Sequence, residues 1–319
     1  MSLPAATRKK LLLPAVTAPM FLVTGVDLAA ASCLAGIAGT LTRNHCRSDE
    51  EFEAQLVAVH DKIARAREED PGRVIGPLFA NVALDRPLEV KKAMLAACRK
   101  NGVDVVITTG GDPREMVEIA GEFGIQIYHD VISLRFAEKA VKANVAGMVA
   151  IGAGGGGHSG TVSHFALVPQ IRRIFDGVII MAGAVSSGGA IRAAEILGAD
   201  LAYLGTRFIA SQESLAPDEY KAMLVSESPA DLIYSNFANG VPAMWMKESI
   251  RRVGLDPDAL PIPVKDRSHL PENVKPWVNL WSAGQGVALI EDIPPVAEIV
   301  ARLKTEYDAA CAAPPFRRA

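Results

Sequence analysis

The chain has 319 residues, of which half are hydrophobic and 22% are charged, so we expect a sizeable buried core, little disorder, and either one large α/β domain with an appendage or two ordinary domains. The formal charge of −3 offers no basic surface for nucleic acid and favours a small-molecule partner. Four cysteines without C-x-x-C spacing argue against a zinc site and a disulfide framework, and a reducing compartment such as the cytoplasm fits best.

An apolar stretch near the N-terminus tests the expectation of a soluble protein. Residues 11–41 carry a single charge and are long enough to cross a bilayer. However, Pro14, Pro19 and Gly25 divide the stretch into pieces of strand and helix length. No cleavage site of small residues follows a continuous apolar core, as it would in a signal peptide. We therefore expect neither a membrane span nor secretion.

Eight short apolar runs of β type follow one another through the first two thirds of the chain. Most are apolar on both faces, which is typical of parallel strands that helices cover on the outside. Because the runs recur at similar intervals, they predict one repeated unit. The runs are residues 12–18, 37–41, 77–84, 103–109, 125–132, 147–153, 178–184 and 201–209.

Amphipathic segments of crossover length lie between these runs, and each predicts a helix. Several end in Gly or Asn directly before the next run, where a helix should stop. Eight βα units in about 210 residues favour a closed (β/α)₈ barrel, a TIM barrel, over an open doubly wound sheet. The predicted helices include residues 50–68, 88–102, 134–145 and 187–199.

The chain changes character after the eighth run. Two segments of helical pattern, residues 217–228 and 243–254, are followed by a polar, proline-rich segment, and a long helical pattern returns from residue 284. We expect residues 213–283 to form a small helical cap inserted after the eighth strand. Residues 1–212 and 284–319 would then form the barrel.

Two glycine-rich turns stand out at the carboxyl ends of the predicted strands, where such barrels place their active sites. The turn GAGGGGHSG carries His158, and the turn AGAVSSGGA runs directly into a predicted helix. Together with LGTR one unit later, the second turn predicts a phosphate site made of backbone N–H groups and hydroxyls. The alternative is that its glycines only ease a tight βα turn. The candidates for the phosphate site are Gly183, Ser186, Ser187, Gly188, Gly205 and Thr206.

The motifs that are missing exclude several other kinds of site. No Rossmann or P-loop glycine pattern follows an early strand, and neither the nucleophile elbow of hydrolases nor H-E-x-x-H occurs. Carboxylates and histidines at metal-ligand spacing are also missing, so we expect no metal. A phosphate site, a glycine-lined wall and one or two histidines instead indicate an organic cofactor that supplies the chemistry.

Seven motifs together resemble those of the nitronate monooxygenases, formerly called 2-nitropropane dioxygenases. In chain order they are PAVTAPM, NVAL, TTGGDP, GGGGHSG, AGAVSSGG, LGTRFIASQES and WSAGQG, over about residues 12–300. The resemblance implies that FMN lies across the barrel mouth. The residues implied to hold its phosphate are Ala182, Gly183, Gly205 and Thr206. Those implied to approach its ring are Met20, Phe21, Asn81 and Gly157.

The resemblance also implies the activity, which is oxidation of alkyl nitronates with dioxygen to a carbonyl compound and nitrite. His158 matches the family's active-site histidine and would act as a base toward a nitroalkane or bind the nitro or nitronate oxygens. The alternative is a solvated loop histidine. Asp130 stands near the flavin where relatives carry a lysine, and a carboxylate would not stabilise negative charge on the reduced ring as an ammonium does.

Four other histidines carry weaker signals. His129 lies within the fifth run and is either a barrel-lining residue or a packed, hydrogen-bonded core residue. His60 falls on a charged helix, and His164 and His269 fall in polar loops, so the surface is the expectation for all three.

Residues in or beside the cap also allow two interpretations. Trp245, Trp277 and Trp281 either cover the substrate pocket or form the core of the cap. Ser282 and Gln285 either contact the flavin or cap the last helix. The sequence does not separate these roles.

Two further functions stay open from the sequence. An FMN-dependent reductase on the same scaffold would pass hydride from NAD(P)H to a quinone or an enoyl thioester. A non-catalytic barrel would only bind a phosphate-bearing ligand. We expect the nitronate monooxygenase activity, with a nitronate or nitroalkane and dioxygen as small-molecule partners, and a homodimer as an assembly that barrels of this size often form.

Overall fold

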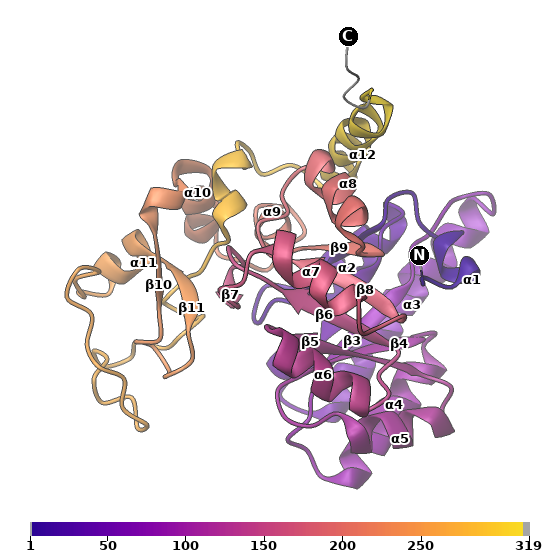
Figure 1. Cartoon of the computed structure of the whole chain (residues 1–319), viewed down its shortest axis with the longest axis horizontal. Coiled ribbons are helices and arrows are strands. Elements are labelled where there is room, and N and C mark those ends of the chain that lie inside the picture. The colour runs from indigo at the N-terminus through magenta and orange to yellow at the C-terminus, as the bar shows by residue number, and fades with distance from the viewer. Residues whose placement is uncertain (1, 315–319) are drawn as a thin grey trace.

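Eight parallel strands pair in the order β1-β9-β8-β6-β5-β4-β3-β2 in the computed structural model, which describes residues 2–314 (Figure 1). A parallel bridge between Val16 and Ala38 joins the two end strands and closes the sheet. The predicted (β/α)₈ barrel is confirmed, and each strand overlaps one predicted run. The strands are β1 (Ala15–Thr17), β2 (Gly39–Thr42), β3 (Leu78–Ala83), β4 (Val105–Thr109), β5 (Gln126–Val131), β6 (Gly147–Ile151), β8 (Val178–Ala182) and β9 (Leu201–Leu204).

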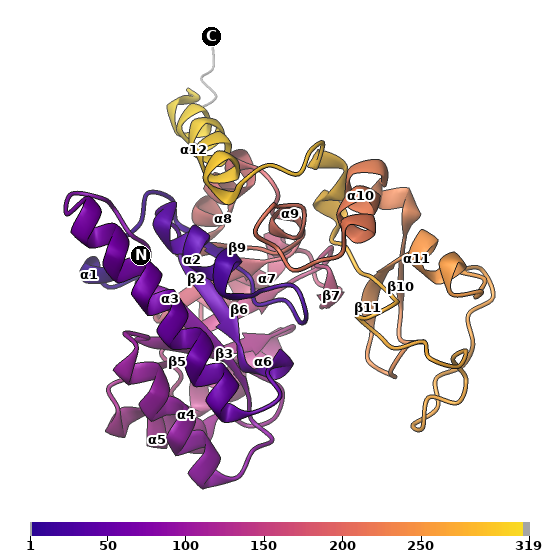
Figure 2. The same cartoon turned by 180° about the vertical axis from the view of Figure 1, so that it is seen from behind.

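Helices cover the outside of the barrel, as the views from both sides show (Figures 1 and 2). Within residues 2–314, no helix combines the length and the apolar character that a membrane crossing needs. The helices are α1 (Ala5–Arg8), α2 (Val26–Leu34), α3 (Asp49–Glu69), α4 (Leu88–Lys100), α5 (Arg114–Glu122), α6 (Leu134–Lys142), α7 (His164–Arg172), α8 (Gly188–Leu197), α9 (Thr206–Ile209) and α12 (Val296–Ala312), with a 3₁₀ turn η1 (Arg43–His45) after β2.

At three junctions between a helix and the next strand, the helix ends at the predicted stop residue. Gly102 after α4, Asn144 after α6 and Gly198 after α8 have φ values of 76°, 56° and 106°. This left-handed conformation costs glycine nothing, and asparagine tolerates it better than most residues. The stop residues therefore end each helix and turn the chain back into the barrel.

The lower part of the barrel is filled by side chains, so a cavity can open only above them. Phe79 of β3 and Tyr128 of β5 belong to a fully buried cluster inside the barrel, where their rings meet edge to face with centroids 6.2 Å apart. Side chains two positions apart on a strand share a face. Asn81 and Asp130 therefore also point inward, one layer closer to the carboxyl ends.

The cap stands beside the barrel mouth and differs in part from its prediction (Figure 2). Residues 243–246 were expected to start a helix but form the central strand β11 of a three-stranded antiparallel sheet. All four residues are buried, and the sequence alone does not distinguish a helix from a strand in a short apolar run. The cap is therefore mixed α/β. Its elements are α10 (Asp218–Ser226), η2 (Pro229–Asp231), β10 (Leu232–Ser235), β11 (Ala243–Met246) and α11 (Lys247–Arg252), and η3 (Gln285–Leu289) leads back to the barrel.

The last barrel helix packs closely on α8, and a glycine makes this possible. A Cβ atom at Gly188 would overlap the backbone of Leu303 and Tyr307 in α12. The backbone N–H of Gly188 also donates to the Glu306 carboxylate at 2.6 Å. The first turn of α8 is therefore in direct contact with α12, and no side chain fits between them.

We predict that Gly188→Ala destabilises the protein by about 2 kcal/mol, because overpacking at a tight contact costs about 1–3 kcal/mol. The matched control is Gly189→Ala, because an added Cβ there meets nothing closer than Ser187 Oγ at 3.9 Å. Alanine favours a helix over glycine by up to about 1 kcal/mol, so the control should be neutral or slightly more stable. Urea unfolding midpoints measure both effects, and equal midpoints would contradict the predicted contact.

Candidate functional site

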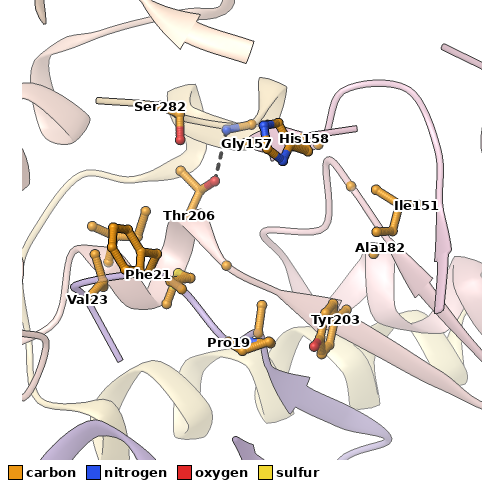
Figure 3. A pocket seen from close by; sticks show the side chains of 18 of the residues that line it. Pro19, Phe21, Val23, Ile151, Gly157, His158, Ala182, Tyr203, Thr206 and Ser282 are labelled. Atoms are coloured by element: carbon orange, nitrogen blue, oxygen red, sulfur yellow. Dashed lines mark hydrogen bonds between the residues drawn. The ribbon is translucent and has the colours of Figure 1, made fainter. Parts of the chain in front are cut away.

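A cavity of about 540 Å³ opens at the carboxyl ends of the barrel strands, next to the cap (Figure 3). Cofactor sites occupy about 300–1,000 Å³, so the volume suits a cofactor with a small substrate. The structure brings all ten predicted site residues into the lining, although their roles stay predictions. They are Met20, Phe21, Asn81, Asp130, Gly157, His158, Ala182, Gly183, Gly205 and Thr206.

One wall of the cavity is made by two glycine-rich segments that touch through their backbones. A Cβ atom at Gly156 would lie 2.9 Å from the nitrogen of Gly284, and one at Gly284 would lie 2.8 Å from the oxygen of Gly154. The backbone N–H of Gly284 donates to Thr206 Oγ1 at 2.9 Å, a bond drawn in Figure 3. The glycines of the sixth turn thus serve a close contact with residues near the end of the cap, as well as lining the cavity.

The turn after β8 lies at the cavity in a conformation that exposes its backbone. Gly183 and Ala184 have φ values of 116° and 55°, and both line the cavity together with Ser186. Thr206, the first residue of α9, leaves its backbone N–H without an intrahelical partner. N–H groups and hydroxyls of this kind can hold a phosphate.

Two residues predicted for the phosphate site lie outside the cavity. Ser187 caps α8, where its Oγ accepts the backbone N–H of Ala190. The N–H of Gly188 is already bonded to Glu306. These groups stabilise the packing of α8, so the prediction of a role in phosphate binding is wrong for both.

Asn81 is fixed in one orientation at the inner wall of the cavity. Its Oδ1 accepts a bond from Thr42 Oγ1 at 3.0 Å, and its Nδ2 donates to the carbonyl of Ile107 at 3.2 Å. An amide nitrogen carries two N–H groups. One N–H of Asn81 is therefore left to donate to a ligand.

His158 lies at the junction of barrel and cap. With Gly157 it forms the short strand β7 (Gly157–His158), the edge of the cap sheet, in which it pairs with Ala243. The edge of Trp277 meets its ring, with centroids 5.4 Å apart. Partial burial lowers the pKa of His158 below its ordinary value, so the ring is held in its neutral form near pH 7.

Asn239 of the cap defines which nitrogen of His158 carries the proton. The backbone N–H of Val241 donates to Asn239 Oδ1 at 3.1 Å, which turns Nδ2 of the same amide toward His158 Nε2 at 3.2 Å. An amide N–H can only donate, so Nε2 must offer a lone pair. In the neutral ring the proton is then on Nδ1, and His158 is a hydrogen-bond donor through that atom.

Two polar side chains, half-buried Asp130 and buried Tyr203, line the same cavity. Burial raises the pKa of Asp130 to about 7, although a hydrogen bond from Thr109 opposes the rise. Burial also raises the pKa of Tyr203 well above its ordinary value, and the Asp130 carboxylate adds to the rise. Among residues 2–314, neither Asp130 Oδ1 nor the Tyr203 hydroxyl has a hydrogen-bond partner.

The cavity contains few charges. The titratable side chains that line it, within the described part of the chain, are Asp130, His158, Tyr203 and Tyr220, and no lysine or arginine is among them. An anionic ligand would therefore be bound by N–H and O–H dipoles instead of by cations.

The other histidines separate into three cases. His129 is buried, lies outside the cavity lining and places Nδ1 2.8 Å from Thr108 Oγ1, so the packed core interpretation holds. His164 and His269 were expected at the surface but are half-buried, and each donates through Nε2 to a backbone carbonyl, at 2.7 Å and 2.6 Å. His60 is exposed as expected.

The cap tryptophans divide between the two roles left open by the sequence. Trp245 is fully buried and stacks on Trp277, with centroids 4.3 Å apart. Trp277 and Trp281 line the cavity, as does Ser282. Gln285 begins η3, and its backbone N–H donates to Gly154 at 2.8 Å.

Sequence reasoning missed two residues of the site. Tyr203 could have been found, because it lies two positions before Gly205 and strand side chains alternate. Asn239 gave no signal, since only the pairing of β7 with the cap brings it to His158.

Known proteins resemble this chain in sequence and in fold. The sequence model of the family "Nitronate monooxygenase" matches residues 6–306. A nitronate monooxygenase of Paraburkholderia phytofirmans is 26% identical, with 92% of each chain covered. The structure of a nitroalkane oxidase from Streptomyces ansochromogenes is similar with a TM-score of 0.74 at 25% identity, covering 97% of this chain and 99% of that one. FabK from Thermotoga maritima shares the fold, with a TM-score of 0.71 at 23% identity over 95% of both chains.

The family match extends over nearly the whole chain and includes both glycine-rich turns and His158. On this ground the chain belongs to the nitronate monooxygenase family, a family of oxidoreductases.

Proposed function

We propose that the protein uses FMN to oxidise alkyl nitronates with dioxygen, giving a carbonyl compound and nitrite. The observation that carries the proposal is the position of His158 at the cavity with Asn239 Nδ2 next to its Nε2, which leaves Nδ1 of the ring to donate to a substrate. The family membership of the chain supports the same reaction class.

The residues of the cavity fit FMN. Its phosphate would be held by Ala182, Gly183, Gly205 and Thr206, where exposed backbone and a hydroxyl replace the missing cations. Its ring would be approached by Met20, Phe21, Gly157 and the free N–H of Asn81. The two touching glycine segments keep side chains away from the space that a flat ring needs.

Bound FMN would supply the redox chemistry of the reaction between the nitronate and dioxygen. His158 would bind the substrate through Nδ1, whose N–H can donate to a nitronate oxygen. Its Nε2 would meanwhile keep accepting the hydrogen bond from Asn239. Removing a proton from a neutral nitroalkane would instead need a lone pair on Nδ1, which this tautomer lacks. The arrangement therefore favours the preformed nitronate over the nitroalkane.

Oxygen uptake and nitrite release test the proposed reaction. The purified yellow protein should consume oxygen and release nitrite when mixed with an alkyl nitronate and no nicotinamide. The parent nitroalkane at equal concentration should react more slowly. An oxygen electrode and a nitrite assay measure both. Rapid bleaching of the flavin by NADH without nitronate turnover would favour the reductase, and a colourless protein that takes up no FMN would favour a binding barrel.

Substitution of His158 tests its role in binding the nitronate. His158→Ala should keep FMN bound and lower kcat/KM for the nitronate about a hundredfold, because a positioned donor to a charged group contributes about 1.5–3 kcal/mol. His60→Ala is the matched control, since His60 is exposed on α3. Visible absorbance reports the bound flavin in both variants. Unchanged kcat/KM in His158→Ala would remove His158 from the mechanism.

Substitution of Asn239 tests its role as a positioning residue. Asn239→Asp places a carboxylate at Nε2, which favours a protonated ring, so the proton affinity of His158 should rise about tenfold. Titration of the His158 ring proton by NMR measures this independently of turnover. Asn236→Asp is the control, because Asn236 is exposed in the same loop. Equal titration curves for the two variants would contradict the role of Asn239.

A further inference from the structure

Two buried polar atoms at the bottom of the cavity come from opposite parts of the barrel sheet. Asp130 lies on β5 and Tyr203 on β9, with β6 and β8 between them in the sheet. Both line the cavity, and Tyr203 is only 8% exposed (Figure 3). Within the described residues, Asp130 Oδ1 and the Tyr203 hydroxyl have no hydrogen-bond partner.

Such atoms are uncommon in folded proteins, because a buried polar group without a partner costs about 1–3 kcal/mol. Asn81, which lines the same cavity, differs in that both ends of its amide are bonded to the protein. Asp130 and Tyr203 belong to residues that line the cavity, yet Asp130 Oδ1 and the Tyr203 hydroxyl have no such bond within residues 2–314. This indicates that the partner is part of the ligand.

The surroundings of Asp130 oppose a negative charge. Burial raises the pKa of Asp130 to about 7 and outweighs a hydrogen bond from Thr109 of the neighbouring strand β4, which by itself favours the carboxylate. The groups that can ionise around the cavity are otherwise His158, Tyr203 and Tyr220, and within residues 2–314 no lysine or arginine lines it. Nothing there balances a buried carboxylate, whereas a neutral carboxyl group has an O–H to donate.

We propose that Asp130 binds the flavin in its protonated form, donating its carboxyl O–H to an acceptor atom on the polar edge of the ring, with the Tyr203 O–H as a second donor at the same edge. The proposal rests on FMN as the cofactor of the proposed function and adds a proton to its binding. The O–H of each residue then gains the partner that the protein does not provide.

The pH dependence of binding follows from linkage. In the ligand-free protein the pKa of Asp130 is raised to about 7 by burial, and a bond made only by the protonated form raises it further in the complex. Affinity is therefore highest below pH 7. Above pH 7 the affinity falls by up to tenfold per pH unit, and each binding event takes up as much as one proton.

The proposal also accounts for an aspartate at this position. A neutral carboxyl group adds no negative charge beside a ring that becomes more negative on reduction, so repulsion does not arise. It supplies a hydrogen bond where an ammonium group would supply a charge.

The test is the binding of FMN and of riboflavin to apoprotein, followed by quenching of flavin fluorescence between about pH 6 and 9. Riboflavin lacks the phosphate, which itself titrates near pH 6. We expect Kd for both ligands to rise at least tenfold across this range in the native protein. Asp130→Asn cannot lose a proton and should show a nearly flat profile. Asp176→Asn, an exposed position before β8, is the matched control and should behave like the native protein.

Calorimetry of the native protein in buffers of different ionisation enthalpy gives a second measurement that needs no variant. Uptake of close to one proton per riboflavin at pH 8 supports the proposal. A pH-independent Kd without proton uptake overturns it while leaving FMN as the cofactor. Absence of flavin binding at every pH would instead contradict the proposed function itself.

Discussion

The pairing of β7 with β11 is the contact on which the site depends. It takes two residues of a barrel loop, Gly157 and His158, and makes them the edge of the cap sheet. Tyr234 of β10 strengthens the same junction, since its hydroxyl donates to the backbone of Ser159 at 2.6 Å. The position of the imidazole is therefore set by the cap, whereas the cavity beside it is built by the barrel.

Charge is handled in this site by dipoles. The lining within residues 2–314 has no lysine or arginine, so under the proposed function a phosphate would meet backbone N–H groups, and a nitronate would meet a neutral imidazole. N–H dipoles that are fixed by the fold need little reorganisation when charge moves. They also bind an anion less strongly than a cation does, which suits a substrate whose product must leave.

Much of the barrel was predictable because its signals are local. Apolar runs give strands, and residues such as Gly102, Asn144 and Gly198 give helix ends through their own conformational preferences. The ten predicted residues of the cavity could be found from the sequence for a related reason, since the carboxyl ends of the strands in a barrel converge on one face. Helix α7 was not among the predicted elements, and it includes a proline, Pro169, that weakens a helical signal.

The parts that the sequence did not reveal depend on contacts between distant segments. Residues 243–246 are equally suited to a buried helix or a strand, and their pairing with β10 and with Gly157 and His158 decides for the strand. His164 was expected at the surface because its neighbours are polar, yet it bonds to the carbonyl of Ala182 across the barrel wall. Asn239 contacts His158 although the two residues lie 81 positions apart in the sequence.

The position of α12 has a consequence for how the protein is made. The chain leaves the barrel after β9, builds the cap, and only then returns with a helix whose Val296, Ile299, Val300 and Leu303 are buried. During synthesis, the apolar surface of α8 stays uncovered until α12 has left the ribosome. The nascent barrel therefore exposes an aggregation-prone apolar surface while the cap is translated. A chaperone would have to bind this surface during that time.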